Sequence, residues 1–211
     1  MSLIVAIDGP AAAGKGTLAR RLAAALGFDY LDTGLLYRAV GMSLVRAGLD
    51  PAATAGAEAA AKALAAADLQ APDLRGDDAA QAASKVAVIP AVRVALLDFQ
   101  RRFAAQPPTG KGAVLDGRDI GTVVCPQATA KLFVTASVEK RAERRLKELQ
   151  SRGLEAIQSA VLADMRERDE RDSNRSAAPL KAADDAFVLD STDLDADQAY
   201  AAALEYVQSK L

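Results

Sequence analysis

The sequence predicts an α/β protein in which one five-stranded parallel sheet carries helices on both faces. Three observations lead to this fold class. Short apolar runs such as residues 3–8 lack the alternation of a half-exposed strand and are typical of strands buried on both sides. Segments with helical periodicity separate these runs, so each helix can return the chain to the same edge of the sheet. The length of 211 residues fits one domain with insertions.

Taken in order, the elements alternate along most of the chain. The expected strands are residues 3–8, 28–32, 113–116, 131–136 and 186–190. The expected helices are 15–26, 33–47, 50–67, 79–105 with an interruption at Pro90, 138–152, a segment ending near 172, and 196–210. Gly27, Gly48 and Gly153 follow helical segments and indicate their ends. Residues 68–78 contain Pro72 and Gly76 and are predicted to be a loop.

The same pattern suggests how the chain is divided. Residues 1–49 and 106–211 supply the strands and are expected to form the core of a single domain over 1–211. The alanine-rich helices of about 50–105 are expected to form an inserted arm, and about 145–175 a short lid.

Composition excludes several classes of function. The net charge is −2, with 26 basic and 28 acidic residues, so no basic excess points to nucleic acid or to an anionic membrane. No apolar run approaches the roughly 20 residues that span a bilayer, and we expect no signal peptide and a cytoplasmic protein. The single cysteine, Cys125, fits a reducing compartment. Histidine is absent, so a metal would bind oxygen atoms, which points to Mg²⁺.

A loop between the first strand and the first helix has the layout of a phosphate cradle. It comprises Gly9, Pro10, Ala11, Ala12, Ala13, Gly14, Lys15, Gly16 and Thr17. Small residues let backbone N–H groups approach phosphates, and the helix that begins near Lys15 adds the positive end of its dipole. Lys15 is a mobile charge that can follow the transferred phosphate. We therefore expect this loop to bind ATP with Mg²⁺ near Thr17; the alternative is a glycine turn without a ligand.

Polar residues follow two other strands at the edge where open parallel sheets bind ligands. After the second strand come Thr33, expected to cap the next helix, then Tyr37 and Arg38. These three are predicted to bind substrate, although a capped helix with a surface arginine would have the same pattern.

The strand 113–116 ends in a second polar group. Asp116 matches the carboxylate that holds the Mg²⁺ shell in phosphate-loop enzymes. Gly117 permits a sharp turn, after which Arg118 and Asp119 project as a donor and an acceptor. The alternative is a surface turn with a weak ion pair.

Arginines gather near the end of the predicted lid. Arg168, Arg171, Asp172 and Arg175 are spaced at i, i+3, i+4 and i+7, which places them on one helical face. Such a face suits the binding of a phosphate and a ribose. The alternative is a charged face exposed to solvent, which is the usual structure of a run of charged residues. Of the arginines on the preceding helix, Arg144 is the candidate for a nucleotide contact.

Four motifs together resemble the bacterial cytidylate kinase family over nearly the whole chain. They are Gly-Pro-x-x-x-Gly-Lys-Gly-Thr, Leu-Asp-Thr-Gly-x-x-Tyr-Arg, Asp-Gly-Arg-Asp-x-Gly-Thr-Val-Val and Glu-Arg-Asp-x-Arg-Asp-x-Asn-Arg. The resemblance implies transfer of the terminal phosphate of ATP to CMP or dCMP with Mg²⁺. The positions that it implies for the CMP phosphate are Thr33, Arg38, Arg118 and Arg175. Those that it implies for the cytosine are Ser84, Arg93 and Asp119, and Arg168 and Asp172 match positions near the ribose and the transferred phosphate.

Two departures from the family pattern accompany this resemblance. Ala11 and Ala12 occupy positions where many relatives carry Ser and Gly. Residues 68–84 are too short, and too rich in alanine and aspartate, for the small β-sheet that many members carry in the arm.

Two rival functions remain at this point. One is another small-molecule kinase, for adenylate or shikimate, and the other is a nucleotide-binding switch protein without transfer chemistry. The paired arginine groups favour a kinase, with small-molecule partners and a monomeric state expected.

Overall fold

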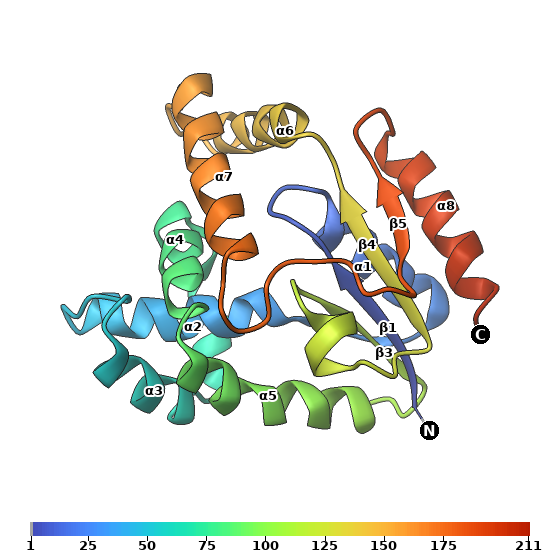
Figure 1. Cartoon of the computed structure of the whole chain (residues 1–211), viewed down its shortest axis with the longest axis horizontal. Coiled ribbons are helices and arrows are strands. Elements are labelled where there is room, and N and C mark those ends of the chain that lie inside the picture. Colours follow the sequence, from blue (N-terminus) through green and yellow to red (C-terminus); the bar gives the residue numbers. More distant parts are fainter. Residues whose placement is uncertain (1) are drawn as a thin grey trace.

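The computed structural model describes residues 2–211 and contains one five-stranded, wholly parallel sheet (Figure 1). Its strands are β1 (Leu3–Asp8), β2 (Asp29–Asp32), β3 (Gly112–Asp116), β4 (Ala130–Thr135) and β5 (Phe187–Asp190). Their order across the sheet is β2-β3-β1-β4-β5. The connection after β1 leads to β2 on one side of the sheet, and the connection after the neighbouring β3 leads to β4 on the other. The carboxyl ends of β1 and β3 therefore form the switch point at which such sheets bind ligands. The predicted fold class is confirmed.

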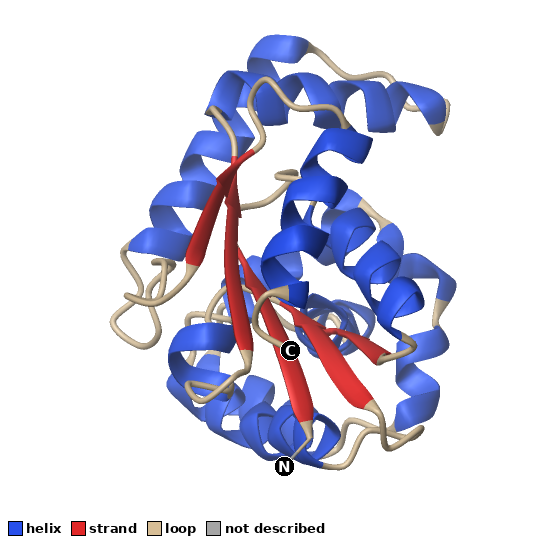
Figure 2. Ribbon diagram, turned by 90° about the vertical axis from the view of Figure 1, so that its right-hand side faces the viewer, coloured by secondary structure: helices blue, strands red, loops and turns tan. Residues whose placement is uncertain are grey.

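The helices lie on both faces of the sheet, as Figure 2 shows. They are α1 (Lys15–Leu26), α2 (Thr33–Arg46), α3 (Thr54–Lys62), α4 (Asp77–Val86), α5 (Pro90–Ala105), α6 (Val138–Ser151), α7 (Gln158–Ser173) and α8 (Ala196–Gln208). Short helical turns are η1 (Ala66–Gln70), η2 (Pro72–Arg75) and η3 (Ile120–Val124). No helix within residues 2–211 combines the length and the apolar character needed to cross a membrane.

The central strand β1 is buried on both sides. Val5 and Ile7 pack with Leu22 of α1 and other side chains of the α1 and α8 side. Ala6 packs with Leu115 on the opposite side, under α5 and η3. Burial on both faces removes the need for polar residues at alternate positions, which explains the unbroken apolar runs.

A second apolar cluster joins α2 to α3, α4 and α5. Leu36 and Val40 of α2 pack there with Val86, Val92 and Leu96. Thus α2 begins at the sheet edge and also forms part of the core of the helical arm. The division into a core of 1–49 and 106–211, an arm of about 50–105 and a lid of about 145–175 stays a prediction.

The helix expected over 50–67 is wrong in extent, because local hydrogen bonds compete with it at both ends. Asp50 accepts from the backbone N–H of Ala52 at 2.9 Å, and α3 begins only at Thr54. Asp68 accepts from the N–H of Ala65 at 2.8 Å and favours the turn η1 instead of a longer helix. Residues 68–78, expected as a loop, include η2 and the start of α4. None of the described strands lies in this segment, as the sequence indicated.

Candidate active site

The phosphate loop connects the carboxyl end of β1 to the first turn of α1. Gly9 adopts φ 142°, and a Cβ atom there would overlap the carbonyl oxygen of Val134 on β4, so only glycine fits. The side chain of Lys15 is buried and its Nζ donates to the carbonyl of Pro10 at 2.7 Å. The lysine therefore lies within the curve of the loop, while Thr17 is exposed beside it.

The charges around Lys15 favour an anion. Burial, reinforced by the nearby guanidinium groups of Arg118 and Arg168, lowers the pKa of Lys15 to about 7, although Asp116 opposes this shift. Burial, together with Arg118, also lowers the pKa of Arg168 to about 10. Cations held this close together and away from water gain from a phosphate group between them.

Asp116, at the end of β3, lies against the start of α1. A Cβ atom on Gly16 would be 3.3 Å from Asp116 Oδ2, so the carboxylate is next to the loop residue that precedes Thr17. A carboxylate and a hydroxyl form an oxygen donor set that fits Mg²⁺. Within residues 2–211 no group of three or more His, Cys, Asp or Glu side chains could hold a metal.

The end of β2 is tied to the end of β3 by Thr33. Its Oγ1 donates to the backbone carbonyl of Asp116 at 2.8 Å. The expectation that Thr33 caps α2 is wrong, because Asp32 is the cap and accepts from the N–H of Leu35 at 3.2 Å. Asp32 also pairs with Arg38 at 2.8 Å. Thr33 and Arg38 thus both lie at the sheet edge beside Asp116.

Asp172 brings two of the predicted arginines together. Arg118 Nε donates to Asp172 Oδ2 at 3.0 Å, and Arg175 Nε donates to its backbone carbonyl at 3.1 Å. Because α7 ends at Ser173, Arg175 lies beyond the helix and not on the helical face that the spacing predicted. Arg168 Nε and Arg175 Nη2 are buried and have no hydrogen-bond partner within residues 2–211, although Arg175 Nη2 lies 3.4 Å from Asp172 Oδ1 in an ion pair. Buried guanidinium donors without a hydrogen bond are suited to a phosphate ligand.

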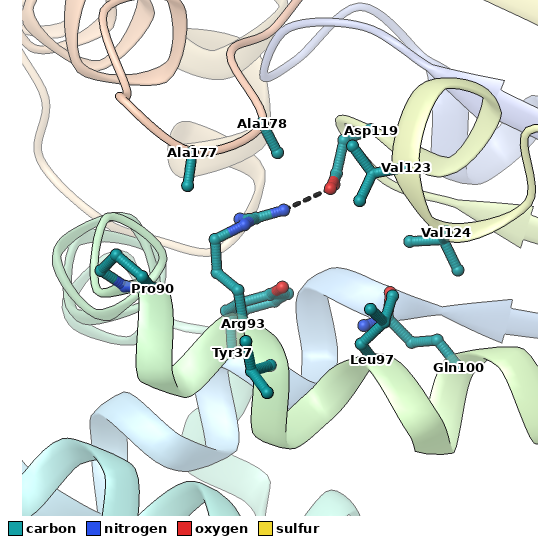
Figure 3. A pocket seen from close by; sticks show the side chains of 11 residues that line it. Tyr37, Pro90, Arg93, Leu97, Gln100, Asp119, Val123, Val124, Ala177 and Ala178 are labelled. Atoms are coloured by element: carbon teal, nitrogen blue, oxygen red, sulfur yellow. Dashed lines mark hydrogen bonds and ion pairs between the residues drawn. The ribbon is translucent and has the colours of Figure 1, made fainter.

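Next to this cluster lies a cavity of about 200 Å³ (Figure 3). Across it Arg93 of α5 forms an ion pair with Asp119, and both side chains are largely buried. The Arg93 guanidinium lies 5.6 Å from the centre of the Tyr37 ring. The other lining residues are Pro90, Val94, Leu97, Gln100, Val123, Val124, Ala177 and Ala178. A small, mainly apolar cavity with one donor and one acceptor suits a flat heterocycle.

Ser84, predicted together with Arg93 and Asp119, does not line this cavity. It is buried on α4, where its Oγ accepts from Arg171 Nε at 3.3 Å. The Arg144 guanidinium donates to the backbone carbonyl of Ser191 at 2.5 Å and to the Ser191 hydroxyl at 3.0 Å, and this hydroxyl lies 3.3 Å from the carbonyl oxygen of Ala13 in the phosphate loop. Arg144 therefore lies one residue away from the loop, and its contact with the nucleotide stays a prediction.

Two side chains that contact the site escaped the sequence analysis. Arg141 is buried and donates to the carbonyl of Ala11 in the phosphate loop at 3.3 Å and to Asp169 at 2.5 Å. Asp8 accepts from the backbone N–H groups of Ile120 and Gly121, both at 2.7 Å. Its position as the last residue of β1 was the one available signal.

The alanines at two positions of the phosphate loop are explained in part by their neighbours. Ala11 and Ala12 pack against an apolar cluster of α6 and α7 that contains Ala142, Leu149 and Met165. Methyl groups at these loop positions thus contribute to the contact with α6 and α7. Ala12 has φ 57°, a backbone conformation that favours glycine and that costs an alanine about 1–2 kcal/mol.

Two regions suited to anions therefore lie at one sheet edge, one built on the loop after β1 and one on the arginines around Asp172. This arrangement suits phosphoryl transfer between two phosphorylated small molecules. The fold and the site define a phosphate-loop kinase of the nucleoside monophosphate kinase class.

Comparison with known proteins narrows this class to one family. The family model described as cytidylate kinase matches residues 5–209, and the chain belongs to this family. A protein of Paramagnetospirillum magneticum named cytidylate kinase is 78% identical over 210 residues, which is 100% of both chains. One of Rhodospirillum rubrum with the same name is 60% identical over 99% of this chain and 98% of its own. The structure of a sugar kinase from Janibacter sp. HTCC2649 shares the fold, with TM-score 0.53, 15% identity, and 99% and 95% coverage of the two chains.

Proposed function

We propose that this enzyme transfers the terminal phosphate of ATP to CMP, and to dCMP, giving ADP and the nucleoside diphosphate. The observation that carries the proposal is the Arg93–Asp119 pair in a cavity beside the phosphate-binding arginines. Cytosine presents an amino group at position 4 and acceptors at N3 and O2. A carboxylate accepts from the amino group and a guanidinium donates to the acceptors, so this pair matches the edge of cytosine.

The donor side of the proposed reaction is the phosphate loop. The residues proposed to bind ATP are Gly9, Pro10, Ala11, Ala12, Ala13, Gly14, Lys15, Gly16 and Thr17. Thr17 and Asp116 would hold Mg²⁺, which neutralises phosphate charge when bound. Lys15 serves the charge that develops on the transferred group. Arg144 is proposed to contact the nucleotide from its position beside Ser191, which itself contacts Ala13 of the loop.

The acceptor side uses residues from several elements. Thr33 and Arg38 are proposed to bind the CMP phosphate, with Arg118 and Arg175. Arg168 and Asp172 would lie near the transferred group and the ribose, and Tyr37 and Ser84 near the nucleoside. The attacking phosphate oxygen is already ionised, so the reaction needs no strong base. Positioning and electrostatic stabilisation supply the acceleration. The arm of about 50–105 and the lid of about 145–175 are proposed to bring the two substrates together in a monomer.

A coupled assay of ADP release tests this function with a panel of common nucleoside monophosphates and shikimate. We expect rapid turnover with CMP and dCMP and much slower turnover with the others. Lys15→Ala should lose activity by at least tenfold with the fold retained, because one such electrostatic contact is worth roughly 3–4 kcal/mol in the transition state. Lys62→Ala, at an exposed lysine of α3, is the matched control. Hydrolysis of ATP that no acceptor accelerates would instead support a switch protein.

A further inference from the structure

Arginines of the two lid helices contact one short segment of the arm. Arg171 of α7 donates to the Ser84 hydroxyl at 3.3 Å and to Gln81 Oε1 at 2.8 Å, both on α4. Arg145 of α6 pairs with Asp77, the first residue of α4, and Arg152 donates to the carbonyl of Arg75 at 3.0 Å. Figure 1 shows α7 reaching α4 at this point. Lid and arm are therefore joined directly, in addition to any contact through a substrate.

Arg171 differs from the neighbouring arginines in what it contacts. Arg168 and Arg175 each have a buried donor without a hydrogen bond, and Arg175 pairs only with Asp172 three residues before it. Arg171 instead bonds to protein groups across the gap between two elements. Its acceptor Ser84 is 4% exposed, so the hydroxyl is oriented by a fixed partner. A hydroxyl oxygen that accepts from a guanidinium keeps its own hydrogen available to donate elsewhere. Arg171 thus determines the direction in which Ser84 can hydrogen bond.

The joining arginines also have acidic partners on their own helices. Arg171 pairs with Glu167 four residues earlier, and Arg145 pairs with Glu148 at 2.6 Å. If α4 and α7 separate, each guanidinium keeps an ionic partner, so no buried charge is left unpaired. Separation then costs only the hydrogen bonds across the gap. Contacts of this kind can form and break with substrate binding. Each contact shifts the equilibrium between the joined and the separated arrangement by its own modest free energy.

We propose that Arg171 is a positioning residue that couples the arm to the lid, orienting the Ser84 hydroxyl and making ATP and CMP favour each other's binding. The inference rests on the proposed function, because it takes ATP to act on the lid side and CMP on the arm side. The coupling must be reciprocal. If ATP raises the affinity for CMP by some factor, CMP raises the affinity for ATP by the same factor. Loss of Arg171 should lower this factor severalfold, within the roughly 5–150-fold range common for such coupling.

Isothermal titration measures the coupling directly in the full chain. The dissociation constant of CMP is determined alone and with a non-hydrolysable ATP analogue plus Mg²⁺, and the reverse titration checks reciprocity. Arg171→Met should bring the two dissociation constants of CMP, with and without the analogue, close together. The affinity for the analogue in the absence of CMP should stay nearly unchanged. The matched control is Arg166→Met, because Arg166 is 61% exposed on the same helix and pairs with Glu139 of α6 instead of the arm. Wild-type coupling in Arg171→Met would overturn the proposal.

A second variant tests the contact by strengthening it. Gln81→Glu replaces a neutral acceptor by a carboxylate facing Arg171, and charge-assisted hydrogen bonds are the stronger kind. The coupling factor should rise in the wild-type background and stay unchanged in the Arg171→Met background. An equal effect in both backgrounds would refute the role of Arg171. If another monophosphate proves to be the acceptor, the proposed function fails, and the same titrations with that nucleotide still decide the role of Arg171.

Discussion

Base recognition by Asp119 can be tested with one nearly isosteric substitution. Its side chain is 7% exposed and pairs with Arg93, whose side chain is 10% exposed. Asp119→Asn keeps the shape but removes the charge and replaces one acceptor by a donor. The carboxylate accepts from the amino group of cytosine and repels the oxygen that uracil carries at the same position. The amide can turn its N–H toward that oxygen, so the substitution should favour uracil relative to cytosine.

The expected size of the effect follows from the burial of the pair. One unsatisfied buried hydrogen-bonding group costs about 1–3 kcal/mol, which corresponds to roughly ten- to a hundredfold in discrimination. Complete removal of one partner of a buried ion pair costs about 3–5 kcal/mol. The loss here should be smaller, since the amide oxygen can still accept and Arg93 also donates to the carbonyl of Ala87 at 3.2 Å. We therefore expect kcat/KM for CMP to fall and the CMP/UMP ratio to narrow by at least tenfold.

The assay is ADP release at saturating ATP with CMP and UMP varied in turn. Thermal unfolding establishes that the variant is folded at the assay temperature. Asp98→Asn provides the control, since Asp98 is an exposed aspartate of α5 outside the lining of the base cavity. An unchanged ratio on folded protein would mean that Asp119 does not face the base. The assignment of the substrate would then depend on family membership alone.

Three further predictions concern single side chains. Arg175→Ala should weaken CMP binding and turnover with little effect on ATP affinity. Normal kinetics with CMP would mean that Arg175 has only a structural role. Burial and nearby arginines lower the pKa of Lys15 to about 7, and bound phosphates should raise it again. ATP binding at pH 8 should therefore take up close to one proton, and the affinity for ATP should fall as pH rises above about 7. Titration calorimetry in buffers of different ionisation enthalpy measures this uptake, and finding none would contradict the prediction. Cys125→Ser should keep full activity, because burial raises the pKa of the thiol to about 11 and leaves it unreactive. Rapid alkylation of the native protein at pH 8 would refute the reasoning.

Strands and their ends were predictable because burial on both faces leaves a strong local signal. The run 3–8 coincides with β1, and 113–116 differs from β3 by one residue. Once a parallel sheet is predicted, residues after strand ends must meet at one edge, which brings Lys15, Thr33 and Asp116 together without further information. The loop after β1 and the turn after β3 followed from the same logic.

Side-chain partners were less predictable, because sequence spacing gives a helical face but not what that face meets. Arg141 and Arg144 are three residues apart on α6, yet the first contacts the phosphate loop and the second the segment after β5. The choice between Asp32 and Thr33 as cap of α2 likewise depended on Asp116 lying within reach of the Thr33 hydroxyl. Arg171 belonged to a predicted charged face, but its partners come from α4, almost ninety residues away in sequence.

Asp8 connects two parts of the site, the phosphate loop and the turn that carries Asp119. It precedes Gly9 of the phosphate loop, and its carboxylate accepts from the N–H groups of Ile120 and Gly121, directly after Asp119. Carboxylate bonds to backbone N–H groups are among the stronger hydrogen bonds, and these are buried. The loop proposed to hold ATP and the residue proposed to read cytosine are therefore connected through one buried side chain at the end of β1. The movement proposed for the arm and the lid would therefore leave Lys15 and Asp119 in one frame at the sheet edge.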